Sequence, residues 1–248
     1  MATANPAMTV AAYQRAGRAD SPASVMTLSG SVVKTSILVL ILLVTAAFTW
    51  HEASVGETGV TYGLLIAGCI GGFLVALLTI FVPKLSPFTA PLYAALEGLV
   101  MGAISAVFES QYPGIVLQAV GLSVGVLAVM LFLYGTGIIR ATEKFKIGVI
   151  AATGAICLVY LASMVMSLFG VRIPLIHESG SVGIGFSLVV VVIAALNLIL
   201  DFDFIQQGVT QQAPKYMEWY GGFSLLVTLV WMYLEILRLL SKLRNSRN

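Results

Sequence analysis

Charged residues are scarce in this chain: aspartate, glutamate, lysine and arginine together make up 10% of its 248 residues. A typical soluble domain carries about 25% charged residues, so this chain has too few of them to cover a water-facing surface. The formal net charge is only +2, whereas a protein that binds nucleic acid needs a concentrated basic surface to neutralise phosphates. The composition therefore argues against a soluble globular fold and against a nucleic-acid partner.

Cysteine and histidine are also scarce, with two residues of each type. Cys69 and Cys157 lie in apolar stretches, which is more typical of small buried residues than of a disulfide or a metal pair. His51 and His177 lie outside those stretches, and no His-x-x-x-His or Cys-x-x-Cys motif occurs. We therefore expect no bound metal, no cofactor and no enzyme activity.

Long apolar stretches occupy nearly all of the chain after Ser31, and seven of them run for about 17 to 25 residues each. The hydrocarbon core of a bilayer is about 30 Å thick and needs about 20 apolar residues per helix. We therefore predict an all-α, polytopic membrane protein with a bundle of seven transmembrane helices. The expected spans are residues 33–50, 62–82, 88–108, 114–134, 147–169, 182–200 and 219–240.

The apolar stretches divide the chain into three parts. Residues 1–30 are rich in Ala, Ser and Thr and are expected to form a mobile cytoplasmic tail. Residues 31–241 form the transmembrane domain, and residues 242–248 form a short basic tail.

The distribution of lysine and arginine predicts the orientation, because basic residues concentrate in cytoplasmic loops. With the N-terminus in the cytoplasm, the inside segments contain Arg15, Arg18, Lys34, Lys84, Arg140, Lys144, Lys146 and Lys215. The outside loops contain only Arg172. Seven full spans place the C-terminus outside, although it carries Lys242, Arg244 and Arg247. Either this tail is an exception, or one segment is re-entrant and both termini lie inside.

Two small-xxx-small patterns lie inside apolar spans, at Gly98 and Gly102 and at Gly121 and Gly125. Small residues at this spacing let two helix backbones approach closely in a bilayer. We expect them to pack helices within the bundle, with dimerisation as the alternative.

Five acidic residues in or beside the spans are candidates for an ion pathway or for pH sensing, because an ionisable group in a bilayer is costly and usually functional. They are Glu97, Asp201, Asp203, Glu218 and Glu235. Glu97 is the deepest isolated charge, near the middle of the third span. It is either a protonated side chain hydrogen-bonded to a neighbouring helix or part of an ion or proton path.

The other four acids lie on the sixth and seventh spans. Asp201 and Asp203 are expected to close the sixth span, and at about 100° per residue at most one of them faces the interior. Alternatively, both are solvated at the membrane surface. Glu218 opens the seventh span, where a carboxylate caps the positive end of the helix dipole. Arg238 follows Glu235 by three residues, so an intrahelical ion pair is the simplest structural explanation for Glu235.

Six segments share their pattern with one family of membrane proteins. They are Leu-Asp-Phe-Asp-Phe-Ile at 200–205, Ala-Pro-Lys-Tyr-Met-Glu-Trp-Tyr-Gly-Gly at 213–222, Trp-Met-Tyr-Leu-Glu-Ile-Leu-Arg-Leu-Leu at 231–240, Ala-Pro-Leu-Tyr-Ala-Ala-Leu-Glu-Gly-Leu at 90–99, Ile-Ser-Ala-Val-Phe-Glu at 104–109 and Thr-Glu-Lys-Phe-Lys at 142–146. Through these segments, residues 30–241 resemble the transmembrane Bax inhibitor motif family (Bax inhibitor-1-like), most closely its bacterial branch. The resemblance implies a seven-helix bundle with the last helix near its centre, in the inner membrane of a cell.

The same resemblance implies a slow, pH-sensitive calcium leak that is gated by a pair of carboxylates on the sixth and seventh helices. Two close carboxylates cannot both ionise cheaply, so such a pair titrates as a unit, and oxygen ligands suit calcium. The acid on the sixth helix matches Asp201 or Asp203, and the acid on the seventh matches Glu235. The expected partners are therefore the lipid bilayer, protons and calcium ions that bind transiently at these three residues.

The spacing of these acids leaves two arrangements open. Asp201 and Glu235 have 33 residues between them. Glu235 also follows Glu218 by 17 residues, which is about 25 Å along a helix. Either the seventh helix is displaced or re-entrant and Asp201 meets Glu235, or Asp201 meets Glu218 at the same membrane level.

Two other functions remain as alternatives. The resemblance also allows a non-transporting regulator that binds a membrane protease or another integral protein through its helices or its N-terminal tail. Such a regulator would lose activity without residues 1–30 but tolerate amides in place of the bundle acids. An intramembrane enzyme is the third hypothesis, and a metal bound to the purified protein would support it.

Overall fold

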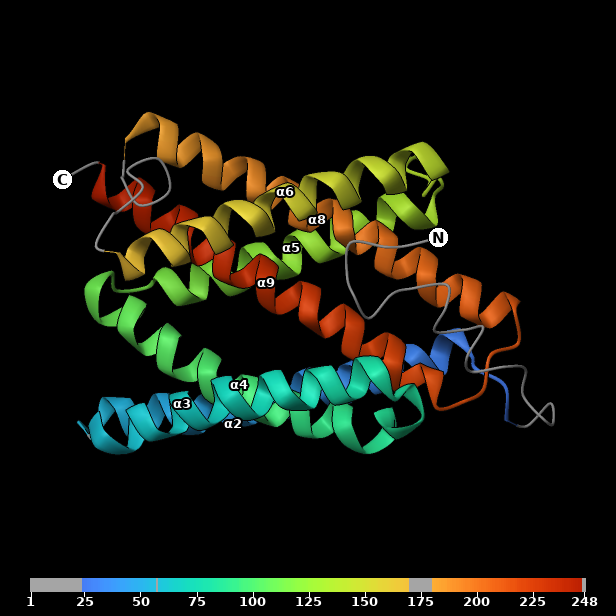
Figure 1. Cartoon of the computed structure of the whole chain (residues 1–248), viewed down its shortest axis with the longest axis horizontal. Coiled ribbons are helices and arrows are strands. Elements are labelled where there is room, and N and C mark those ends of the chain that lie inside the picture. The colour runs from blue at the N-terminus through green and yellow to red at the C-terminus, as the bar shows by residue number, and fades with distance from the viewer. Residues whose placement is uncertain (1–23, 57, 170–179, 247–248) are drawn as a thin grey trace. The chain divides into compact units, whose positions relative to one another are not determined.

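The computed structural model describes residues 24–56, 58–169 and 180–246, which are helical almost throughout (Figure 1). The helices are α2 (Leu28–Ser54), α3 (Thr58–Phe81), the short 3-10 helix η2 (Pro83–Leu85), α4 (Ser86–Gln111), α5 (Ile115–Gly135), α6 (Glu143–Leu168), α8 (Ser181–Thr210) and α9 (Met217–Asn245). Seven helices in these ranges are long and apolar enough to cross a membrane. The chain is thus an all-α, polytopic membrane protein, as predicted.

Each predicted span falls within one of these helices or extends past its end by about one residue, and several helices are longer than predicted. The largest difference is at α8, which continues ten residues beyond the predicted end at Leu200. Lys242 and Arg244, which we assigned to a basic tail, belong to the last turns of α9. The predicted mobile tail lies outside the described residues up to residue 23, and its last three residues open α2.

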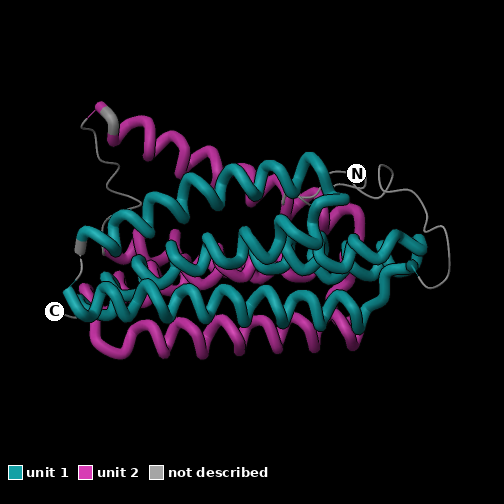
Figure 2. Tube along the Cα trace, turned by 90° about the horizontal axis from the view of Figure 1, so that it is seen from below, with its two compact units in different colours: residues 1–111, 201–227 teal, residues 112–200, 228–248 magenta. Residues whose placement is uncertain are grey.

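The chain divides into two compact units, which Figure 2 shows in different colours. Unit 1 consists of Met1–Gln111 and Asp201–Val227, and unit 2 consists of Tyr112–Leu200 and Thr228–Asn248. The helices α8 and α9 each contribute one part to either unit.

In unit 1, α2 and α3 both pack against α4, and glycines provide the room for this packing. A methyl group at Gly98 would overlap Thr45 and the Leu42 carbonyl of α2, and one at Gly102 would overlap the Ala46 carbonyl. These two glycines therefore pack α2 against α4 as predicted, because only a residue without Cβ lets the backbones come so close.

The first part of α9 lies in the interior of unit 1. A methyl group at Gly222 would touch Thr35 of α2, and Tyr93 of α4 meets Phe223 edge to face, with ring centroids 4.9 Å apart. Tyr220 lies beside Phe204 of α8. Burial of such aromatic pairs within one helix cluster stabilises their mutual orientation.

In unit 2, polar side chains join the helices. Asn197 of α8 donates from Nδ2 to Thr153 Oγ1 of α6 at 2.8 Å. Arg244 of α9 donates to Gln118 of α5 and to the Pro113 carbonyl before it. In each unit, α9 thus contacts other helices of that unit, and its central place in the whole bundle stays a prediction.

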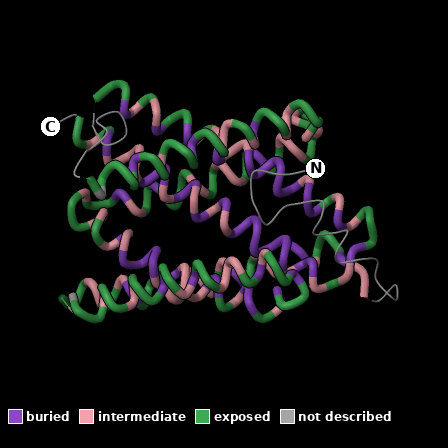
Figure 3. Tube along the Cα trace, viewed as in Figure 1, coloured by how far each residue is buried: buried purple, intermediate pink, exposed green. Residues whose placement is uncertain are grey.

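Many large apolar side chains face outward, and Figure 3 shows long exposed stretches on the helices. On α3 they are Val60, Tyr62, Ile66, Ile70, Phe73, Leu74, Leu78 and Phe81. A water-soluble monomer rarely exposes so much contiguous apolar surface, whereas lipid chains cover such a surface without cost. Cys69 and Cys157 are also exposed, so our expectation that both are buried is wrong: they lie on outward faces of apolar helices.

Replacement of Gly102 by alanine should destabilise the protein, because the new methyl group would overlap the Ala46 carbonyl. Overpacking of this kind costs about 1–3 kcal/mol, or about 2–4 °C in Tm for each kcal/mol. Thermal unfolding of the purified protein in detergent measures this change. Gly125→Ala is the matched control, since no described atom outside its own helix backbone lies within 4 Å of a methyl group there. Equal Tm values for the two variants would contradict the assigned packing.

Candidate functional site

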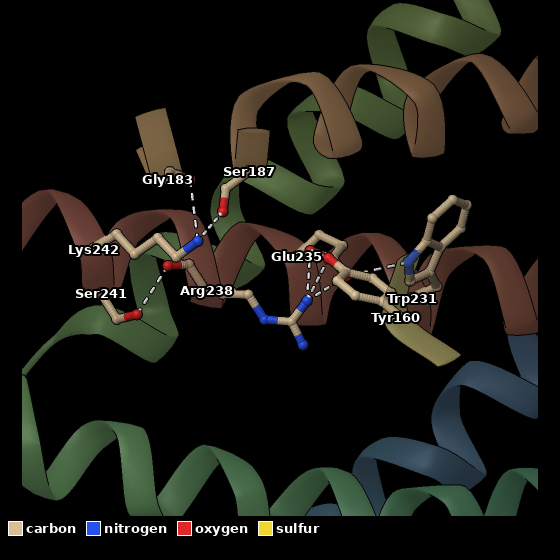
Figure 4. Close-up of polar contacts among 8 residues, drawn as sticks. All are labelled: Tyr160, Gly183, Ser187, Trp231, Glu235, Arg238, Ser241 and Lys242. Carbon is tan, nitrogen blue, oxygen red and sulfur yellow. Dashed lines mark hydrogen bonds and ion pairs between the residues drawn. The ribbon is translucent and has the colours of Figure 1, made fainter. Parts of the chain in front are cut away.

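The carboxylate of Glu235 lies at the centre of a polar cluster in unit 2 (Figure 4). Arg238, on the next turn of α9, donates from Nη1 to both carboxylate oxygens at 2.8 and 2.9 Å. The Tyr160 hydroxyl of α6 lies 3.0 Å from each oxygen and accepts from the same guanidinium nitrogen at 2.7 Å. Trp231 donates its indole N–H to Glu235 at 3.3 Å. The predicted intrahelical ion pair is therefore present.

The pair is unequally exposed: the Glu235 side chain is 2% exposed and that of Arg238 is 40% exposed. The Arg238 guanidinium also lies over the Tyr160 ring, 5.0 Å from its centroid. A buried charge is tolerated when a counter-charge and hydrogen bonds compensate it. Arg238 thus reaches from the exposed side to neutralise a carboxylate that has no access to solvent.

Lys242, one turn beyond the partly exposed Arg238 on α9, is a buried cation of unit 2 (Figure 4). Its ammonium group donates to Ser187 Oγ at 2.8 Å and to the Gly183 carbonyl at 3.0 Å, both on α8. Sequence reasoning missed this contact, because nothing in the local pattern links residues 55 and 59 positions apart. Lys242 therefore joins the last turns of α9 to the first turns of α8.

Glu218 lies in unit 1 and is buried at the first turn of α9. Its Oε1 accepts hydrogen bonds from the Thr27 backbone N–H at 3.0 Å and from the Thr27 hydroxyl at 2.9 Å. Thr27 is the N-cap of α2. Glu218 lies in the first turn of α9, where we predicted it. Its hydrogen bonds to Thr27 also satisfy the start of α2, which is 191 residues away in sequence.

The two aspartates of α8 lie inside the helix, so the prediction that they close it is wrong. The helix continues because Phe202, Phe204 and Ile205 extend its buried face and no glycine or proline interrupts it before Gly208. Asp201 is buried, and the reading in which both acids are solvated at the membrane surface is therefore also wrong.

Asp203 is half-buried and accepts a hydrogen bond from the Gln207 side chain. The two aspartates therefore differ in burial, as their spacing predicted. Asp201 belongs to unit 1 and Glu235 to unit 2, so a pairing of these acids stays a prediction. A meeting of Asp201 with Glu218 likewise stays a prediction.

Glu97 lies on α4 and forms a side-chain hydrogen bond with Tyr93, one turn earlier on the same helix. Gly72 of α3 lies beside it, with a methyl group built there 3.5 Å from Glu97 Oε2. The Glu97 carboxylate therefore lies beside α3 at Gly72. Its hydrogen bond with Tyr93 lies within α4, and both alternatives for Glu97, a protonated side chain bonded to a neighbouring helix or part of an ion or proton path, stay predictions.

No group of three or more His, Cys, Asp and Glu side chains comes together in the described part of the chain. Gly121-Leu-Ser-Val-Gly125 has the spacing of a nucleophile elbow, which needs a sharp strand-to-helix turn to expose its serine. In this chain the segment lies within α5, and Ser123 donates to the Ala119 carbonyl of its own helix. The motif is thus a stretch of ordinary helix. Of the two histidines considered as metal ligands, His177 lies outside the described residues.

Replacement of Arg238 by glutamine should destabilise the protein, because Glu235 would keep its burial but lose the guanidinium that forms an ion pair with it. A buried charge that loses a charged hydrogen-bond partner costs about 1–3 kcal/mol, which thermal unfolding in detergent can measure. Glu235→Gln combined with Arg238→Gln should cost less than Arg238→Gln alone, since no uncompensated charge remains.

Lys146→Gln provides the matched control. It breaks another ion pair of the same i,i+3 spacing, Glu143 with Lys146 at 3.6 Å, in which the glutamate is exposed. Exposed pairs contribute about 0–1 kcal/mol. If Arg238→Gln costs no more than Lys146→Gln, the guanidinium does not compensate Glu235.

Comparison with protein families identifies the chain. A family model described as Bax inhibitor 1 like matches residues 5–245, which is nearly the whole sequence. Searches of curated proteins and of solved structures gave no match. The motifs that carry the resemblance in sequence also contain Glu235, at the centre of the polar cluster, and Glu218, which bonds to Thr27. The chain is a multi-span membrane protein that belongs to the Bax inhibitor 1 like family.

Proposed function

We propose that this protein is a slow, proton-controlled leak for cations, with calcium as the physiological ion. One observation carries the proposal: Asp201, Glu218 and Glu235 lie in membrane-spanning helices with exposed fractions of 1%, 1% and 2%. Ionisable side chains are rare in such helices and usually line ion or proton pathways. Carboxylate oxygens are also the ligands that calcium prefers.

Asp201 and Glu235 are the two acids to which we assign control by protons. Glu235 is compensated by Arg238 and Tyr160, so a change in its protonation would rearrange the charges of the cluster. Asp201, Asp203 and Glu235 are the residues at which calcium would bind in passing, and Glu97 is a further candidate on α4. Opening would then follow protonation of these carboxylates rather than the binding of a resident metal.

The cellular setting is part of the same proposal. Lysine and arginine concentrate in alternate loops, which favours an N-terminus in the cytoplasm. The resemblance to bacterial members of the family favours the inner membrane.

Calcium flux into liposomes that contain the purified protein tests this function. The flux is measured from about pH 5 to pH 8, and the wild-type flux should change with pH because ionisable groups in membrane-spanning helices usually serve ion or proton pathways. Asp201→Asn and Glu235→Gln imitate the protonated carboxyl and cannot titrate, so each should flatten the pH profile. If both variants kept the wild-type pH profile, neither acid would control the flux.

One control and one further variant separate a specific effect on the flux from a general one. Glu143→Gln removes an exposed acid at the start of α6 and should leave the pH profile unchanged. Asp203→Asn tests whether the half-buried acid two residues from Asp201 contributes. Absence of protein-dependent flux at every pH would reject the leak in favour of a membrane regulator, which tolerates the amides.

A truncation designed to test the regulator should remove only residues 1–23. Deletion of residues 1–30 would also remove Thr27 and with it the hydrogen bonds to Glu218, so the loss of activity would have two causes.

A further inference from the structure

A short segment before α2 lies along the segment before α9, within unit 1. The Met26 N–H donates to the Ala213 carbonyl at 2.7 Å, and the Lys215 N–H donates to the Ser24 carbonyl at 2.7 Å. Val25 and Pro214 form an isolated antiparallel bridge between these bonds. Residues 24–27 are thus attached to the turn that leads into α9.

The attachment is completed by one side-chain contact. The Thr27 hydroxyl accepts from the Gly30 N–H at 3.0 Å, as an N-cap does, and donates to Glu218 at 2.9 Å. The Thr27 N–H donates to the same carboxylate oxygen. A single threonine therefore satisfies the start of α2 and binds a buried acid of α9 at once.

This arrangement completes a capping box with a carboxylate from another helix. In a capping box, an acidic residue three positions after the N-cap accepts from the N-cap N–H. That position is Gly30 in α2, and Glu218 occupies the space that its side chain would need, because a methyl group at Gly30 would overlap the Glu218 carboxylate. Gly30 and Glu218 together thus replace a local cap by a contact that joins α2 to α9.

Contacts on the following turns orient the same two helices. The Lys34 ammonium lies 5.0 Å from the centroid of the Trp219 ring, and a methyl group at Gly222 would touch Thr35 at 3.1 Å. The Ser86 hydroxyl of α4 donates to the Tyr216 carbonyl at 2.9 Å just before α9 begins. The first turns of α9 are therefore held from the side of α2 and from α4.

The contact between residues 24–27 and the turn before α9 combines one buried side chain with few hydrogen bonds. The Met26 side chain is buried, whereas Thr27 is exposed, and the isolated bridge has two backbone hydrogen bonds and no ladder on either side of it. Segments with exposed backbone hydrogen bonds open locally before the rest of a protein unfolds. Thr27 supplies both of the hydrogen bonds to Glu218 described above, so loss of these two bonds would break the side-chain contact between residues 24–27 and α9.

We propose that residues 24–27 form a strap that holds the first turns of α9, with Thr27 and Glu218 as its fastening. Undoing the strap loosens these turns and raises the ion leak. The effect on the leak rests on the function proposed above, whereas the effect on α9 does not.

Hydrogen exchange measured by mass spectrometry on the full chain in liposomes tests the strap itself. Thr27→Val removes the hydroxyl, and Gly30→Ala displaces the carboxylate while keeping every polar group. Both should speed exchange at residues 217–222 by about tenfold or more, because opening then breaks fewer hydrogen bonds to Glu218. Glu218→Gln keeps the Thr27 cap of α2 and should speed exchange in α9 but not in α2. Thr136→Val, at an exposed threonine that bonds only to α5 carbonyls, should change nothing.

A disulfide provides the opposite test. Opposed residues of an antiparallel bridge have Cα atoms about 4.5–5.5 Å apart, which lies within the range that disulfides span. Val25→Cys/Pro214→Cys, in a chain with Cys69→Ala and Cys157→Ala, should form a disulfide on mild oxidation. The oxidised form should slow exchange at residues 217–222 and lower calcium flux about threefold or more, and reduction should restore both.

The outcomes separate the strap from the leak. Unchanged exchange in Thr27→Val and Gly30→Ala overturns the strap whatever the flux does. Changed exchange with unchanged flux, in preparations whose wild-type protein does leak, overturns the control of the leak by the strap. If the wild-type protein shows no flux, the proposed leak fails, and the exchange data alone decide on the strap.

Discussion

Compensation of buried carboxylates is the constraint on which the rest of this structure depends. A bilayer offers no water to an ionised group, so each buried acid must find its partners within the protein. Glu235 finds them in Arg238 and Tyr160, and Glu218 finds them in Thr27. Each solution joins α9 to a different helix, α6 in unit 2 and α2 in unit 1, so the acids also fix how helices pack.

Close helix packing supports these contacts, because lipid gives helices little reason to associate beyond contact and hydrogen bonding. Gly98 and Gly102 bring α2 against α4, and Gly30 leaves room for the Glu218 carboxylate. Without Cβ at Gly30, α2 loses a local capping acid but gains one from α9. Gly30 thus makes room for a polar contact at the start of α2, and Gly98 and Gly102 of α4 allow close packing against the middle of α2.

Sequence reasoning succeeded where the signal is local. Apolar length placed all seven spans, and the i,i+3 spacing predicted the pair of Glu235 and Arg238. It failed at the end of α8, where charges at Asp201 and Asp203 were taken as a boundary although the buried apolar face continues past them. Contacts of Tyr160 with Glu235 and of Thr27 with Glu218 bridge 75 and 191 residues. Only packing brings such residues together, and no local periodicity encodes them.

The position of the acids on α9 determines what movement of this helix would cost. Glu218 and Glu235 lie 17 residues apart on one continuous helix, about 25 Å along its axis. Within unit 1, a shift of α9 against α2 breaks the bonds of Glu218 to Thr27. Within unit 2, a shift of α9 against α6 breaks the bonds of Glu235 to Tyr160, whereas its bond to Arg238 moves with α9. Local release of its first turns breaks only the contacts of Glu218. A motion confined to the first turns of α9 would therefore free the Glu218 carboxylate and leave the contacts of Glu235 intact.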